Sequence, residues 1–188
     1  MIISISGLPG SGKSTVAKII SARLGLERIY MGGILRKLAE QKGVSILQLM
    51  KQAETDSTID EEADRYVSEL GRNKDNFLIE SRTAFHFIPN SFKIFIKVEA
   101  KEGARRIYQD LKKEERKNEE KASSEEELAK KLRERVEIDR KRYEKYYGID
   151  FTNENNYDLV INSTYLSPEE VAEKILKAVE KAKEEEEN

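Results

Sequence analysis

Short apolar runs alternate with longer amphipathic stretches along the chain of 188 residues. Between the runs, apolar side chains recur at helical spacing, which predicts a helix after each strand. Strands that alternate with helices form a parallel sheet covered on both faces. We therefore predict an α/β fold with a five-stranded parallel sheet flanked by helices. The predicted strands are 2–6, 28–30, 76–80, 92–98 and 158–162.

The segment 34–72 is too long for a single crossover helix. Turn-forming residues at 43–45 and 56–58 predict that it divides into two or three helices. Ser45 is the expected N-cap of one helix, and Ser57 or Thr58 is the expected N-cap of the next. The segment is therefore predicted to be a helical insertion after the second strand.

A second interruption, at 110–127, is dominated by Lys and Glu and has no aromatic residue. A segment of this composition buries little apolar surface, which indicates a solvated helical hairpin or a flap. Ser123 or Ser124 is the expected N-cap of the apolar-periodic helix that follows. The predicted core is then 1–33, 73–109 and 143–188, with insertions at 34–72 and 110–142.

Residues 7–14 read GLPGSGKS and fill every fixed position of the phosphate-binding P-loop, between a predicted strand and a predicted helix. Glycines let the backbone wrap closely around an anion, and the N–H groups of the loop and the helix N-terminus point at phosphate oxygens. Lys13 is expected to reach the β- and γ-phosphates, and Ser14 to bind Mg²⁺. The sequence thus predicts a P-loop NTPase core that binds ATP with Mg²⁺. The predicted donor-nucleotide residues are Gly7, Gly10, Ser11, Gly12, Lys13, Ser14 and Thr15.

Composition excludes several other kinds of site. The chain has no cysteine and one histidine, His86, so disulfides, thiolate metal sites and multi-histidine metal sites are excluded. The 34 basic and 36 acidic residues nearly balance, which argues against a general nucleic-acid-binding protein. No apolar run approaches the roughly 20 residues of a membrane span, and no signal peptide is recognised. We expect a soluble, cytoplasmic protein.

Phosphoryl transfer requires cations around the charge that spreads over the transferred group. Arginine is the best bidentate partner for phosphate, and several arginines lie at the ends of predicted elements. The chain lacks the guanine-binding N-K-x-D motif of a GTPase, because 73–76 has the wrong spacing and precedes a strand. A kinase that holds two phosphorylated substrates is therefore favoured over a GTPase switch. The candidate arginines are Arg36, Arg82, Arg106, Arg135 and Arg142.

With these positions in view, the chain resembles the nucleoside monophosphate kinases, in particular the short archaeal-type cytidylate kinases. The resemblance covers almost the whole chain. It rests on the P-loop, the R-x-x-x-D-x-x-R spacing and the motifs MGGILR at 31–36, AETDSTID at 53–60, ESR at 80–82 and YGID at 147–150. It implies that 34–72 is an insertion that binds the nucleoside monophosphate and that 110–142 is a charged lid with its following helix.

The resemblance also implies a role for individual residues. Arg36 and Arg82 look like the clamps on the acceptor phosphate, and Glu80 like the acid that orients Mg²⁺-bound water. Arg106 resembles the arginine that packs on the donor base. Arg135 and Arg142 resemble the arginines that bridge the two phosphate groups, with Asp139 positioning them. The implied catalytic residues are Lys13, Arg82, Arg135 and Arg142, and the implied acceptor-binding residues are Arg36, Arg82, Asp139 and Arg142, with Asp60 and Asp64 as further candidates.

The resemblance implies transfer of the γ-phosphoryl group of Mg-ATP to CMP or dCMP. An adenylate kinase of the same fold is an alternative. A kinase-like ATPase that assists ribonucleoprotein assembly is another, suggested by the charged stretch 110–127. Small nucleotides are the expected partners; nucleic acid and membranes are not, and the oligomeric state is left open.

Overall fold

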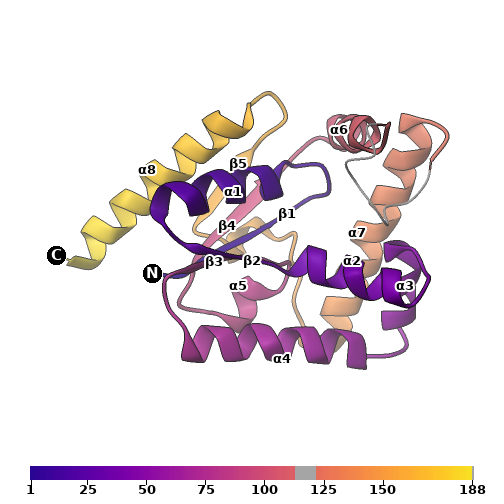
Figure 1. The fold of residues 1–188 in the computed structure, drawn as a ribbon, viewed down its shortest axis with the longest axis horizontal. Coiled ribbons are helices and arrows are strands. Elements are labelled where there is room, and N and C mark those ends of the chain that lie inside the picture. The colour runs from indigo at the N-terminus through magenta and orange to yellow at the C-terminus, as the bar shows by residue number, and fades with distance from the viewer. Residues whose placement is uncertain (113–121, 188) are drawn as a thin grey trace.

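A computed structural model describes residues 1–112 and 122–187. Its centre is a sheet of five parallel strands in the order β2-β3-β1-β4-β5 (Figure 1). All five predicted strands are confirmed, and no end differs from the predicted one by more than one residue. The strands are β1 (Ile3–Gly7), β2 (Glu27–Tyr30), β3 (Phe77–Glu80), β4 (Phe92–Lys97) and β5 (Leu159–Asn162).

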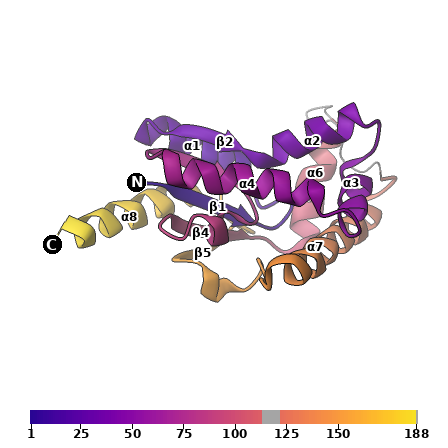
Figure 2. The ribbon, with the colours of Figure 1, turned by 90° about the horizontal axis from the view of Figure 1, so that it is seen from below.

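Helices cover both faces of the sheet (Figures 1 and 2). Successive side chains on a strand point to opposite faces. Ile3 and Ile5 therefore pack with α1 (Lys13–Leu24) and α8 (Pro168–Glu187). Phe77 and Ile79 pack on the other face, where α4 (Thr58–Asn73) and α5 (Ala84–Phe87) lie. The buried core thus forms two apolar layers around the strands.

The insertion after β2 consists of α2 (Met31–Gln41), α3 (Ile46–Ala53) and α4, so both predicted breaks are confirmed. Its first helix follows Tyr30 directly and begins at Met31. Ser45 caps α3 in a reciprocal pair with Gln48, with N···O distances of 3.2 and 2.8 Å.

Ser57 occupies the N-cap position of α4, as predicted, but its side chain makes no capping hydrogen bond. The Asp56 carboxylate accepts the Thr58 N–H at 3.1 Å, and the Ser57 hydroxyl donates instead to Glu61 at 2.6 Å. Asp is as good an N-terminal acceptor as Ser, so the neighbouring carboxylate competes with the hydroxyl for the same N–H groups.

The helices α6 (Ala100–Lys112) and α7 (Glu125–Tyr147) flank the charged stretch and pack together through a small apolar cluster that includes Ile107 and Leu132. Ser124 accepts the Glu127 N–H at 3.2 Å and so caps α7, as predicted. Farther along, α7 packs against the insertion through Ile138. Residues 113–121 of the predicted lid lie outside the described residues.

Candidate active site

The P-loop links the end of β1 to the start of α1. Gly10 has φ +76°, and a Cβ atom there would lie 2.2 Å from the carbonyl oxygen of Gly103 in α6. Gly12, at the N-cap of α1, has φ +80°. Only glycine adopts both conformations at low cost, and Gly10 also requires the absence of a side chain. The motif therefore folds as predicted and presents a helix N-terminus to the site.

A cavity opens beside the P-loop, at the carboxyl edge of β2 and β3. This is where ligands bind in open parallel sheets. It is enclosed by the P-loop, the insertion, the segment after β3 and α7. Its lining includes Lys13, Ser14, Thr15, Tyr30, Met31, Arg36, Met50, Asp60, Asp64, Glu80, Arg82, Thr83, Ile107, Arg135 and Tyr143. The structure thus brings together three of the five candidate arginines with the P-loop lysine.

Arg36 and Arg82 enter the cavity from different elements. Arg36 donates to the Tyr30 hydroxyl at 2.7 Å and to the Gly32 carbonyl at 3.2 Å. Arg82 forms an ion pair with Asp139, and burial, followed by the charge of Arg135, lowers the pKa of its guanidinium to about 9. Crowded cations such as these favour binding of an anion.

Arg142 does not line the cavity, contrary to the prediction that it contacts phosphate. Its side chain is fully buried, with Nε 2.6 Å from Asp60 and Nη2 2.9 Å from Asp139, and Nη1 donates to the Met50 carbonyl at 3.2 Å. A guanidinium that is removed from water needs acceptors around it, and these three elements of the fold supply them. Arg142 therefore joins α3 and α4 to α7 beneath the site.

Asp139 is also fully buried, and it lies between two guanidinium groups. One oxygen pairs with Arg142 at 2.9 Å, and the other pairs with Arg82. It is not among the residues that line the cavity. The resemblance implied that Asp139 contacts the substrate, but a carboxylate enclosed by two guanidinium groups favours a supporting role. Asp139 instead fixes the position of Arg82.

Glu80 ends β3 inside the cavity and is almost completely buried. Arg28 on β2 donates to its Oε1 at 2.6 Å, whereas Oε2 has no hydrogen-bond partner within the described part of the chain. Ser14 lines the same cavity. Mg²⁺ in nucleotide sites is held by one or two protein oxygens together with phosphate oxygens and water, so a hydroxyl with an uncommitted carboxylate oxygen fits it. In the described ranges, no group of three or more metal-ligating side chains forms a separate metal site.

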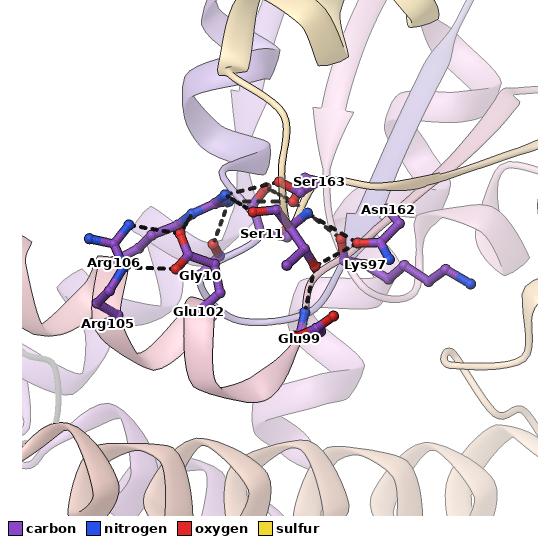
Figure 3. Close-up of polar contacts among 10 residues, drawn as sticks. Gly10, Ser11, Lys97, Glu99, Glu102, Arg105, Arg106, Asn162 and Ser163 are labelled. Atoms are coloured by element: carbon purple, nitrogen blue, oxygen red, sulfur yellow. Dashed lines mark hydrogen bonds and ion pairs between the residues drawn. The ribbon is translucent and has the colours of Figure 1, made fainter.

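Arg106 lies beside the P-loop and joins it to the segment after β5 (Figure 3). Its guanidinium donates to the carbonyls of Ser163 at 2.9 Å and Thr164 at 3.2 Å, and more weakly to Gly10 at 3.4 Å. Glu102 accepts from its Nε at 2.7 Å. Arg106 thereby sets the spacing between the P-loop and the segment after β5. Its packing on the base of the phosphoryl donor stays a prediction.

Asp60 and Asp64 lie one turn apart on α4 and are both buried at the cavity wall. Burial raises the pKa of Asp60 to about 6, and Arg142 opposes the shift. Burial also raises the pKa of Asp64, against the hydrogen bond from Thr83. The cavity therefore contains carboxylates as well as arginines.

Sequence reasoning missed three residues that shape the site. Tyr30 holds Arg36, Arg28 holds Glu80, and Thr83 donates to Asp64 at 2.6 Å. Tyr30 and Glu80 are paired in register on neighbouring strands. Tyr30 ends a predicted strand, as Glu80 does, and this position could have marked it as a site residue. The sequence did not show, however, that β2 and β3 are neighbours in the sheet.

The described part of the chain contains no helix with both the length and the apolar character needed to cross a bilayer.

Comparisons with known proteins identify the family of the chain. Residues 2–165 match the model of the cytidylate kinase-like family. The chain is 37% identical over 185 residues to a cytidylate kinase of Archaeoglobus fulgidus, covering 96% of this chain and 95% of that protein. It is 38% identical over 183 residues to a cytidylate kinase of Sulfolobus acidocaldarius, covering 94% and 92%.

A longer relative shares the same sequence region. The chain is 34% identical over 181 residues to an S-adenosylmethionine-dependent nucleotide dehydratase of Lacinutrix mariniflava. The match covers 96% of this chain but spans only 36% of that protein.

Solved structures confirm the fold. A shikimate kinase from Acinetobacter baumannii superposes with a TM-score of 0.64 over 97% of this chain and 94% of that one, at 17% identity. At that identity the likeness shows the fold alone, which is the predicted P-loop kinase architecture. By the family match and the archaeal relatives, the chain belongs to the cytidylate kinase-like family.

Proposed function

We propose that the chain is a cytidylate kinase, which transfers the γ-phosphoryl group of ATP to CMP or dCMP. The observation that supports this most directly is that the P-loop residues Lys13 and Ser14 line the same cavity as Arg36, Arg82 and Arg135. Lys13 and Arg135 suit the phosphates of the donor ATP, and Arg36 and Arg82 suit the phosphate of the acceptor. The archaeal relatives named above are cytidylate kinases, which supports CMP as the acceptor.

The reaction needs no covalent enzyme intermediate. A phosphate oxygen of the acceptor attacks the γ-phosphorus of ATP, and the bond to the β-phosphate oxygen breaks in line with it. Lys13 and Arg135 stabilise the charge on the transferred group, while Arg36 and Arg82 hold the acceptor phosphate. Catalysis then consists of positioning and charge neutralisation.

Mg²⁺ would be held by Ser14, with Glu80 orienting its water ligands, and when bound it neutralises charge on the β- and γ-phosphates. Arg28 keeps the Glu80 carboxylate in place through Oε1. Asp139 keeps Arg82 in place in the same way. Arg28 and Asp139 therefore hold two residues of the cavity lining, Glu80 and Arg82, in position.

Identification of the product tests the proposal. With Mg-ATP and CMP, ³¹P NMR should show equal amounts of CDP and ADP. Replacement of Lys13 by Ala should reduce turnover by at least about 1,000-fold, because it removes a cation that stabilises transferred charge. Formation of inorganic phosphate in place of CDP by the unmodified protein would overturn the proposal.

A further inference from the structure

The cavity wall formed by α4 differs in charge from the rest of the site. Phosphates require cations, but Asp60 and Asp64 place two carboxylates on one face of this helix, and both lie in the cavity lining. Buried carboxylates repel phosphate, so this wall suits another part of the ligand. In an acceptor whose phosphate lies on Arg36 and Arg82, the remaining parts are the ribose and the base.

The two carboxylates are not equivalent. Asp60 is committed to Arg142, at 2.6 Å. Asp64 has one oxygen, Oδ1, that accepts from the buried Thr83 hydroxyl at 2.6 Å, and this contact fixes the orientation of the carboxylate. Its second oxygen, Oδ2, has no hydrogen-bond partner within the described residues, and the side chain belongs to a residue that is only 6% exposed.

An ionised oxygen that is shielded from water and lacks a donor is costly. Burial accordingly raises the pKa of Asp64. The Tyr147 hydroxyl lies close enough to Asp64 to favour the ionised carboxylate and so to oppose the effect of burial on its pKa. Neither that hydroxyl nor Oδ2, however, makes a hydrogen bond of ordinary length and angle within the described residues. A ligand that brings an N–H group to Oδ2 would relieve this cost.

Pyrimidine bases differ in the group that they present at this edge. Cytosine carries an exocyclic amine at C4, which donates, whereas uracil carries a carbonyl oxygen, which accepts. A carboxylate oxygen therefore attracts the first base and repels the second. Discrimination by an unmatched polar group of this kind is much stronger than discrimination by shape alone.

We propose that Asp64, held by Thr83, is the residue that selects an acceptor base with an exocyclic amine and rejects uracil. The inference rests on the proposed kinase function and assigns the base-reading contact within it. Asp60 supports the wall through Arg142 and does not read the base.

The test is the ratio of kcat/KM for CMP to kcat/KM for UMP, measured with saturating Mg-ATP. In Asp64→Asn the Thr83 hydroxyl can still donate to the amide oxygen, which leaves an NH₂ donor in place of Oδ2. The ratio should fall by about 10- to 100-fold, the range for loss of a hydrogen bond to a charged group. Glu62→Gln is the matched control, because Glu62 is an exposed carboxylate on the same helix, and its ratio should equal that of the unmodified protein.

A comparison of CMP with an analogue that lacks the exocyclic amine tests whether Asp64 recognises that amine. Pyrimidin-2-one riboside 5′-monophosphate lacks the amine of CMP, and the unmodified protein should use it at least about tenfold less well. The substitution and the loss of the amine remove the same contact, so their effects on kcat/KM should not add. In Asp64→Asn, kcat/KM for CMP should therefore exceed that for the analogue by less than about threefold. Thermal unfolding and the KM for Mg-ATP establish that the variant is folded.

The outcomes separate the inference from the proposed function. A folded Asp64→Asn variant with an unchanged CMP to UMP ratio overturns the role of Asp64 while the kinase function stands. Equal use of CMP and the analogue by the unmodified protein also overturns it, even if the variant does not fold. If no nucleoside monophosphate is used at all, the proposed function fails, and the inference fails with it.

Discussion

The guanidinium of Arg82 contacts Asp139 on one side and the cavity on the other, with its carbon centre 5.1 Å from the centroid of the Phe151 ring. Burial and the nearby charge of Arg135 lower its pKa. A phosphate dianion placed against Arg82 offsets that charge crowding. At the residue scale, Arg82 is therefore the group whose loss should be felt by the acceptor rather than by the donor.

Arg82→Ala should raise the KM for CMP by at least about tenfold, because a charge-assisted contact to phosphate is lost. The KM for Mg-ATP should change by less than about twofold. Steady-state kinetics with each substrate varied in turn measures both constants. Arg133→Ala, at an exposed position on α7, is the control and should leave both unchanged. Equal increases in the two KM values would contradict the assignment of Arg82 to the acceptor.

Gly103 allows α6 to lie against the P-loop. A Cβ atom at this position would be 2.7 Å from the Pro9 carbonyl oxygen, which belongs to the loop backbone. Replacement of a helical Gly by Ala normally stabilises a protein by about 1 kcal/mol. Here the contact with backbone should outweigh that gain.

Gly103→Ala should therefore lower the thermal unfolding temperature and raise the KM for Mg-ATP several-fold, since the loop must move away from α6. Lys101→Ala, an exposed change in the same helix, provides the control. A variant with raised stability and unaltered ATP use would show that the P-loop does not depend on this contact.

At the scale of elements, local sequence patterns predicted much of the structure. Apolar runs gave all five strands, and the turn residues at 43–45 and 56–58 gave the breaks in the insertion. Ser45 was identifiable as an N-cap because capping depends on residues within one turn. The Asp56 cap was missed because Asp, Ser and Thr compete for the same N–H groups over three adjacent positions.

Helix α6 carries a pH-sensitive contact beside the P-loop. Glu102 accepts from Arg105 and Arg106, and these hydrogen bonds, with Arg105 first, lower the pKa of Glu102 from 4.5 to about 2. A carboxyl whose pKa is lower in the folded state stabilises the protein above its unfolded pKa and loses this effect as pH falls. The stabilisation is thus present above pH 4.5 and lost between pH 4.5 and about 2.

Glu102→Gln should consequently unfold at a lower temperature than the unmodified protein at pH 7, and the difference should vanish as pH approaches 2. The effect on the free energy of unfolding should be about 1 kcal/mol or less, because Arg105 is exposed and solvent screens the pair. Thermal unfolding followed by circular dichroism over this pH range measures it. A difference that persists undiminished at pH 2 would show that it does not arise from the charge on Glu102.

At the scale of the whole molecule, the sequence predicted the presence of a site but not its assembly. The P-loop has a local motif, and the resemblance to nucleoside monophosphate kinases, which the family match confirms, pointed to Arg36, Arg82 and Arg135. The resemblance placed Arg142 on phosphate, and its spacing from Arg135 and Asp139 suits a shared helix face. Spacing on α7 does not reveal that α3 and α4 cover that face and bury Arg142 against Asp60 and Met50.

We expect the cavity to hold a nucleoside monophosphate as phosphoryl acceptor, opposite ATP. The most direct test is ADP formation from Mg-ATP with CMP, dCMP, UMP, AMP or GMP supplied singly, against a blank without acceptor. We predict strong stimulation by CMP and dCMP and little ADP in the blank. Stimulation chiefly by AMP would make the protein an adenylate kinase, and ATP turnover that ignores every acceptor would contradict the kinase account altogether.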